Sequence, residues 1–213
     1  MMRRHSLPWV FATLLTATLS ACGGGSDPVT VPPQTVRTLS SVSVAAPTVN
    51  VAAGESAAIS ANAFDASNTA LSGVTFTYAS SNATIAEVSG TGSVLALGAG
   101  SATITVTGTL SGVSKAASVA VTVTGSLPAS ASVLGGASGN AFAPATVVIA
   151  TGGSVGWTLG PNTHNVTFDA ATGAPTGIPN GSAVTVSRAF TTAGDFAYQC
   201  TIHAGMTGRV VVR

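Results

Sequence analysis

The chain has 213 residues, a length that suits one large domain or two small ones. Charged residues make up only 6% of the sequence and hydrophobic residues 46%, so the composition is far from that of charge-rich disordered chains. Seven Lys and Arg residues against six Asp and Glu residues give a net charge of +1, and no basic run could neutralise several phosphates. This balance argues against nucleic-acid binding.

Residues 1–21 have the three-part layout of an export signal: the basic pair Arg3-Arg4, an apolar run from about Leu7 to Leu19, and small residues. The run is shorter than the roughly 20 apolar residues that span a bilayer. It ends in LSAC (19–22), which resembles the bacterial lipoprotein signal, in which the cysteine is acylated and becomes the new N-terminus. The resemblance implies a lipid anchor at Cys22 in a bacterial cell envelope, with the outer membrane favoured and the protein facing either the periplasm or the cell exterior. The alternative is an ordinary cleavable signal with a chance cysteine.

Cleavage before Cys22 would remove Arg3 and Arg4, leaving five basic and six acidic residues and a net charge of −1. Residues 22–39 are rich in Gly, Pro and polar residues, which predicts a flexible tether. From residue 40 to 124, short runs of alternating β-branched residues recur between turn signals, as in ATITVT (102–107). Alternation of this kind predicts strands with one buried face, arranged as a β-sandwich.

Two stretches of this segment, FTYASSNATIAEVSG (76–90) and GSVLALGAGSATITV (92–106), resemble the bacterial immunoglobulin-like domains of group 2. The resemblance covers residues 40–124 and implies an immunoglobulin-like sandwich. The segment has no Cys or His, and its acidic residues are scattered along the sequence. We therefore expect a spacer here, in preference to an adhesive module.

The Gly/Ser/Ala-rich segment 125–134 is predicted to be a linker whose later part can already be strand, and residues 135–213 are predicted to form a second β-sandwich. The whole chain is therefore expected to be all-β, with two sandwiches in tandem. Residues 169–182, rich in Gly, Pro and Ala, are expected to form a long surface loop. The strands predicted in the second sandwich are 145–150, 154–159, 164–168, 183–190, 195–200 and 207–212.

Metal-binding residue types are few and concentrated in the second sandwich. After removal of the signal and apart from Cys22, the chain has one Cys, two His and one Met: Cys200, His164, His203 and Met206. Cysteines of exported proteins usually pair, and Cys200 has no partner once Cys22 carries lipid. Two imidazoles, a thiolate and a weak axial thioether are the ligand set of blue copper electron-transfer sites.

The sequence also resembles the cupredoxins, the small blue copper proteins related to plastocyanin and amicyanin. The resemblance rests on THNV (163–166), on the strand AGDFAYQC (193–200) and on the Cys-x2-His-x2-Met loop, and it covers residues 135–213. It implies a Greek-key sandwich with one type 1 copper ion held by the four ligands His164, Cys200, His203 and Met206. It also implies that Asn165 ties the two ligand loops together from outside the ligand set, with Thr201 as its partner.

Two positions depart from the family pattern. Ile202 stands where many relatives have Pro before the loop histidine, and Thr163 stands where amicyanin has Pro. These changes weaken the expectation for loop rigidity but leave the ligand set complete. Within the strand before the loop, Phe196, Tyr198 and Cys200 share parity, so their side chains are expected to face the interior.

The function expected from this resemblance is a membrane-anchored single-electron carrier that meets redox partner proteins and has no small-molecule substrate. The main alternative is a copper module for storage, delivery or sensing without redox turnover; another is an adhesin whose first domain binds and whose copper domain is a cap. Zinc is disfavoured because it prefers a fourth strong ligand or water to a thioether. A buried thiol beside two unrelated histidines is the remaining alternative. The second sandwich has only Asp169 and Asp195 as acids, and two histidines cannot also build further catalytic sites, so an enzyme is not expected.

Overall fold

The computed structural model describes residues 37–136 and 139–213 of the chain. The predicted export signal, Cys22 and most of the predicted tether lie outside the described residues. The described residues form strands, turns and loops without any helix, so the all-β prediction is confirmed. In this part of the chain there is accordingly no helix long and apolar enough to cross a membrane.

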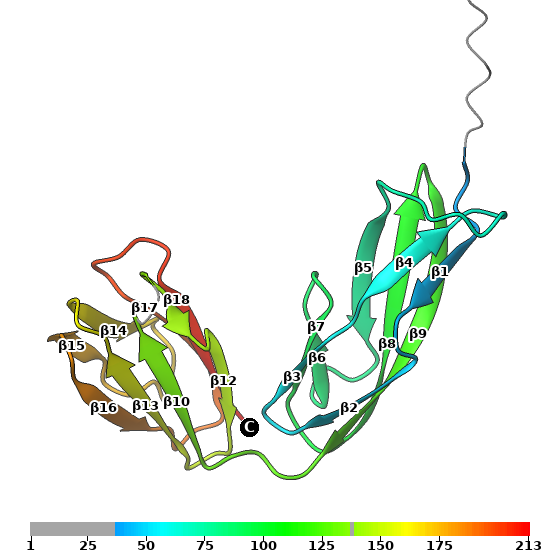
Figure 1. Ribbon diagram of the computed structural model, residues 1–213. Helices are drawn as coiled ribbons and strands as arrows, with labels where there is room; N and C mark the ends of the chain where they lie inside the picture. Colours follow the sequence, from blue (N-terminus) through cyan, green and yellow to red (C-terminus); the bar gives the residue numbers. More distant parts are fainter. Residues whose placement is uncertain (1–36, 137–138) are drawn as a thin grey trace, which may run out of the picture. The chain divides into compact units, whose positions relative to one another are not determined.

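The first sandwich is built from three sheets (Figure 1). A four-stranded sheet has the order β2-β9-β8-β5, a three-stranded sheet has the order β3-β7-β6, and β1 pairs with β4. The long hairpin of β8 and β9 is antiparallel, whereas β2 lies parallel to β9. The strands are β1 (Ser41–Val44), β2 (Thr48–Ala52), β3 (Ser56–Ala58), β4 (Ala61–Phe64), β5 (Thr75–Ser80), β6 (Ala86–Val88), β7 (Ser93–Ala96), β8 (Gly100–Leu110) and β9 (Val113–Thr124).

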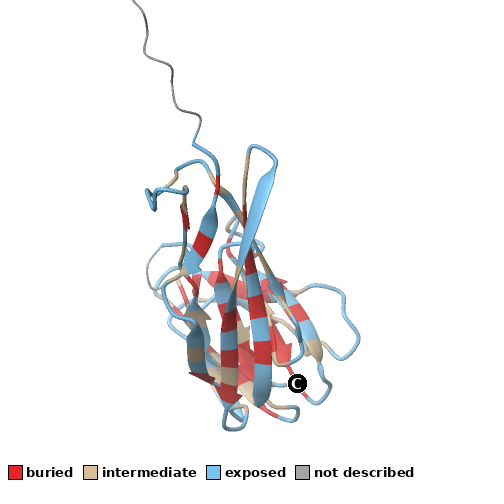
Figure 2. Ribbon diagram, turned by 90° about the vertical axis from the view of Figure 1, so that its right-hand side faces the viewer, coloured by how far each residue is buried: buried red, intermediate tan, exposed pale blue. Residues whose placement is uncertain are grey.

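Alternation along β8 and β9 explains why these residues form a sandwich. Ile104 and Val106 on β8, and Val119 and Val121 on β9, are fully buried, while the residues between Ile104 and its buried neighbours on β8 are exposed. Figure 2 shows the resulting bands of buried and exposed residues along the strands. A side-chain period of two with one apolar face requires the sheet to be covered on that face only.

The second sandwich has two sheets, one of four strands in the order β11-β10-β13-β16 and one of five in the order β12-β18-β17-β14-β15 (Figure 1). The strands are β10 (Ser130–Gly135), β11 (Phe142–Ala143), β12 (Thr146–Ile149), β13 (Ser154–Leu159), β14 (His164–Phe168), β15 (Ile178–Gly181), β16 (Thr185–Ala189), β17 (Gly194–Gln199) and β18 (Thr207–Val212). The six strands predicted in this half of the chain correspond to β12, β13, β14, β16, β17 and β18.

Three strands of this sandwich are not among the six predicted ranges: β10, the two-residue β11 and β15. β10 begins within the expected linker 125–134 and pairs in parallel with β13, and β15 lies within the expected loop 169–182 and pairs with β14. The expectation of a loop throughout 169–182 was therefore wrong. β15 has the sequence Ile-Pro-Asn-Gly, which carries no alternation, and it is an edge strand, where a proline costs no ladder hydrogen bond.

Aromatic side chains fill the core of the second sandwich. Trp157 of β13 is fully buried and meets Tyr198 of β17 edge to face, with ring centroids 5.4 Å apart and an interplanar angle of 89°. Phe142 also packs edge to face against Tyr198, at 4.9 Å between centroids. Burial of each large apolar side chain contributes about 1.5 to 3 kcal/mol, so this cluster fixes the position of β17 against the opposite sheet.

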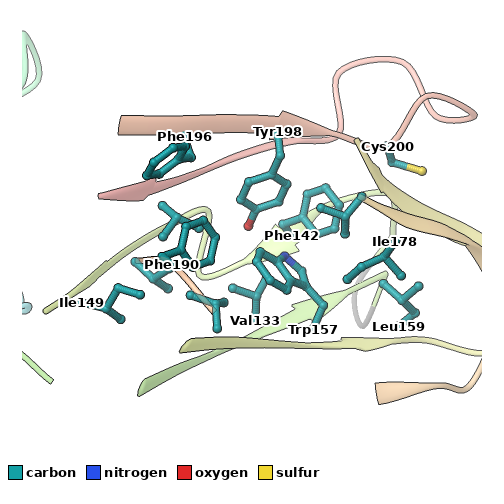
Figure 3. Packing of buried hydrophobic residues seen from close by; sticks show 14 of the residues in the cluster. Val133, Phe142, Ile149, Trp157, Leu159, Ile178, Phe190, Phe196, Tyr198 and Cys200 are labelled. Carbon is teal, nitrogen blue, oxygen red and sulfur yellow. The ribbon is translucent and has the colours of Figure 1, made fainter. Parts of the chain in front are cut away.

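The parity prediction for β17 is confirmed. Phe196, Tyr198 and the following Cys200 are each 2% exposed, whereas Ala197 and Gln199 face solvent. Figure 3 shows the rings of Phe196 and Tyr198 on the same side of the strand, pointing into the core, with Cys200 at its end. The aromatic core therefore determines where the sulfur of Cys200 lies.

Candidate metal centre

The candidate metal-binding side chains come from two neighbouring strands and one loop. His164 is the first residue of β14, Cys200 directly follows β17, and His203 and Met206 lie in the loop between β17 and β18. β14 pairs antiparallel with β17, with Thr167 opposite Gln199. This pairing brings the start of β14 and the end of β17 to the same end of the sheet.

Three donor atoms approach one another closely at this end. The Nδ1 atoms of His164 and His203 are 3.1 Å apart, and the sulfur of Cys200 lies 3.4 Å from Nδ1 of His203 and 4.0 Å from Nδ1 of His164. A triangle with these sides has a point in its plane about 2.1 Å from every corner, close to the roughly 2.0 to 2.3 Å of metal bonds to imidazole and thiolate. The donor set therefore fits one metal ion.

Backbone hydrogen bonds close the loop that carries three of these side chains. The amide of Cys200 donates to the carbonyl of Met206 (2.9 Å), that of His203 donates to Cys200 (3.3 Å), and that of Met206 donates to His203 (3.2 Å). Gly205 supplies the positive φ of 79° that the turn requires. Met206 is 1% exposed and belongs to the same buried cluster as Cys200.

Burial differs sharply between the two histidines. His164 is 0% exposed, whereas His203 is half-buried. Burial lowers the pKa of His164 below its usual value, and the adjacent His203 ring acts in the same direction. His164 therefore stays neutral, the form that binds a metal ion, to lower pH than a solvated histidine would.

Asn165 connects the two sides of the site. Its side-chain amide donates to the hydroxyl of Thr201 (2.7 Å), and its side-chain carbonyl accepts from the backbone amide of Thr201 (2.9 Å). Its own backbone amide donates to the sulfur of Cys200 (3.4 Å). The strand that carries His164 is thereby tied to the loop that carries the other donors, and the sulfur gains a hydrogen bond.

Gly136 forms the wall behind His164. A Cβ atom placed on Gly136 would lie 2.0 Å from Nε2 of His164, so only glycine leaves room for the ring. Nε2 is buried and has no hydrogen-bond partner among the described residues, and Nδ1 is the nitrogen that faces the other donors. Contact with the bare backbone of Gly136 thus keeps the ring close to its observed position.

The structure brings together His164, Cys200 and His203, places Met206 in the adjoining core, and joins Asn165 to Thr201. It adds two residues that sequence reasoning missed: Gly136 behind His164, and Asn180, whose side-chain carbonyl accepts a hydrogen bond from the side-chain amide of Asn165. Gly136 lies in a glycine pair among many small residues, and Asn180 lies in a segment that resembles a loop. Neither position carries a signal in the sequence alone.

The first sandwich matches a known protein family. Residues 38–121 match the family model "Bacterial Ig-like domain (group 2)". This segment is a bacterial Ig-like domain. The match covers most of the segment in which the sequence resembles that family.

Solved structures similar to part of the chain include several cupredoxins. The oxidised plastocyanin from Dryopteris crassirhizoma is 26% identical over 38% of this chain and 99% of its own, with a TM-score of 0.34. A point mutant of amicyanin, in its reduced Cu(I) form at pH 4, is 27% identical over 39% of this chain and 82% of its own, with a TM-score of 0.35. A purple cupredoxin from Nitrosopumilus maritimus is 21% identical over 39% of this chain and 99% of its own, with a TM-score of 0.34. No curated protein matches the chain.

Proposed function

We propose that the protein is an exported, lipid-anchored blue copper protein with one type 1 copper ion, and that it acts as a single-electron carrier. The observation that carries this proposal is the triangle of two imidazole nitrogens and one thiol sulfur, with sides of 3.1, 3.4 and 4.0 Å, beside the buried thioether of Met206. Three strong donors and one soft weak donor are what blue copper sites use.

Each side chain has a separate part in this function. The Nδ1 atoms of His164 and His203 and the thiolate of Cys200 would hold the metal, and Met206 would supply the weak axial ligand. Copper supplies a centre that accepts and returns one electron. The chain supplies a fixed donor set, since the aromatic core, the closed loop and Asn165 hold the donors where they already lie. A fixed set suits both oxidation states with little rearrangement.

Zinc fits this set less well than copper. Structural zinc sites use four strong nitrogen, sulfur or oxygen ligands. Among the described residues the cluster contains no carboxylate, and its three donors are His164, Cys200 and His203. The fourth neighbour is a thioether, which favours a soft metal such as copper.

Storage, delivery or sensing of copper is the other function that this ligand set can serve. The two functions differ in kinetics: an electron carrier has a fast, reversible one-electron couple, whereas a delivery protein releases its metal readily. Stopped-flow measurement of electron self-exchange, together with the rate of copper transfer to a chelator, decides between them. Slow exchange with rapid release would overturn the carrier function.

Electrons should enter and leave through the edge of His203. This ring is half-buried, and it lies between Ile202, which is 46% exposed, and the exposed Ala204. His164 and Cys200 are buried. The ligand loop itself, residues 200–206, has no Asp, Glu, Lys or Arg, so long-range steering of a partner should be weak.

Replacing Ala204 with Glu should slow electron transfer to the physiological partner and leave the copper spectrum unchanged. A carboxylate in a small apolar surface must be desolvated when the partner binds. Stopped-flow kinetics at several ionic strengths measure the effect, with the unmodified protein expected to depend little on salt. An unaltered rate in Ala204→Glu, with a steep salt dependence in the unmodified protein, would place the contact surface elsewhere.

The lipid anchor at Cys22 is part of the proposal and rests on the sequence LSAC (19–22) behind the apolar run. Stable anchoring needs more than one acyl chain, because a single chain binds a bilayer only marginally. In this proposal Cys22 carries the acyl chains, so Cys22→Ser removes the anchor. Membrane fractionation should then find a soluble or an unprocessed protein. If this variant is processed and still sediments with membranes after a high-salt wash, the lipid anchor is wrong.

A further inference from the structure

Asn180 connects the edge strand of the five-stranded sheet to the metal centre. It lies on β15, the strand outside β14, and its side-chain carbonyl accepts a hydrogen bond of 2.8 Å from the side-chain amide of Asn165. This contact links Asn180, fifteen positions away in the sequence, to the residue whose backbone amide donates to the sulfur of Cys200.

A β-bulge places Asn180 at this position. His164 is opposite Gly181, and Val166 is opposite Ile178, so one residue of β14 faces two residues of β15. The residue on β14 is Asn165, and the extra residue on β15 lies in the Pro179-Asn180 pair. Bulges beside functional sites commonly redirect a side chain, and here the redirected side chain reaches Asn165.

Asn180 completes the hydrogen bonding of the Asn165 side chain. An asparagine amide has two donor hydrogens and one acceptor oxygen. The nitrogen donates to Thr201 and to Asn180, and the oxygen accepts from the backbone of Thr201. With all of these bonds made, the amide group of Asn165 has one orientation. Without Asn180 one donor loses its protein partner, and the amide gains freedom to rotate away from the loop.

Arg188 of β16 holds the segment that leads into β15. Its Nε donates to the carbonyl of Thr176 (2.7 Å), and its Nη2 donates to the carbonyl of Gly177 (2.9 Å). Charge-assisted bonds of this kind are stronger than neutral ones. These bonds fix the start of β15 to the four-stranded sheet. Asn180 therefore lies on a strand that is held in place, although β15 is an edge strand.

We propose that Asn180 is a positioning residue for the metal centre: it fixes the side chain of Asn165, and through it both Thr201 of the ligand loop and the hydrogen bond to the sulfur of Cys200. The proposal rests on the proposed copper function. Hydrogen bonds around a copper-bound cysteine sulfur tune the reduction potential. A donor at the sulfur stabilises the reduced state more, because that state carries one more electron. Loss of Asn180 should therefore lower the potential.

The test compares Asn180→Ala with Ser182→Ala, a control at an exposed position just after the end of β15. We expect Asn180→Ala to lower the copper affinity about tenfold, the lower end of what loss of an outer partner costs, and to lower the reduction potential. In the metal-free protein it should speed hydrogen exchange at the backbone amide of Thr201, which donates to Asn165. Asn180→Asp keeps an acceptor oxygen and should restore the slow exchange of the Thr201 amide. Of the three measurements, this exchange rate is the one that the added negative charge affects least.

The exchange experiment uses no metal, so it separates this proposal from the copper function. If the unmodified protein binds no copper, the proposed function fails, and unaltered Thr201 exchange in Asn180→Ala would independently overturn the positioning role. Faster exchange with unchanged copper affinity and potential would also overturn it, because Asn180 would then order the loop without acting on the metal. Agreement of Asn180→Ala with Ser182→Ala in all three measurements contradicts the proposal outright.

Discussion

Replacing Cys200 with Ser is expected to abolish the intense visible absorption of the copper-loaded protein. The band requires charge transfer from a thiolate to Cu(II), and Cys200 is the free cysteine of the described residues, with its sulfur 3.4 Å from Nδ1 of His203. A serine hydroxyl is a harder ligand and is not ionised at neutral pH. The optical spectrum of the variant after addition of Cu(II) measures the effect.

Met206→Leu is the matched variant for this experiment. Leucine has a similar volume and is expected to keep the buried site packed, since Met206 is 1% exposed. Because the thioether is only a weak axial ligand, the band should remain and the reduction potential should shift. Visible absorption that survives in Cys200→Ser would show that another group holds the metal. Loss of the band in Met206→Leu would show that Met206 is more than a weak ligand.

Replacing Gly136 with Ala should displace His164 and remove high-affinity copper binding. The new Cβ would lie 2.0 Å from Nε2 of His164, so the ring must move away from the other donors. Loss of one strong ligand should lower the copper affinity by at least about 100-fold, the upper end of what loss of an outer partner costs. Competition with a copper chelator measures the affinity, and thermal unfolding of the metal-free protein shows whether the variant is folded.

Gly139→Ala is the control for backbone strain. Gly136 and Gly139 have nearly equal φ angles, 78° and 75°, but an added Cβ on Gly139 meets nothing within 4 Å. Alanine in this conformation costs about 1 to 2 kcal/mol at either position. Gly139→Ala should therefore lose stability but keep copper. Equal copper affinity in the two variants would show that the contact with His164 does not position the ring.

The sequence predicts the two sandwiches because their strands follow a simple period. Buried Ala, Ile and Val alternate with exposed Ser and Thr along β8, and the parity of Phe196, Tyr198 and Cys200 matches their burial. β15 could not be predicted in this way. β15 is an edge strand of four residues with a proline, and its strand conformation is stabilised by pairing with β14.

The candidate ligands can be predicted from the sequence because Cys200, His203 and Met206 lie within seven residues. Scarcity also helps, since few other residues of the chain can bind a soft metal. Asn180 and Gly136 could not be predicted from the sequence. The role of Asn180 depends on a β-bulge and that of Gly136 on the close approach of its backbone to His164, and only the folded chain shows these features. Such contacts between distant segments leave no local pattern.

The most direct test of the copper function is the visible and electron-paramagnetic-resonance spectrum of the purified protein loaded with Cu(II) and then titrated with a reductant. We predict one copper ion per chain, an intense thiolate charge-transfer band, and loss of both signals after addition of one electron equivalent, with full recovery on reoxidation. Copper bound without such a band, or a site that prefers zinc and shows no reversible one-electron step, would contradict the assignment of this centre.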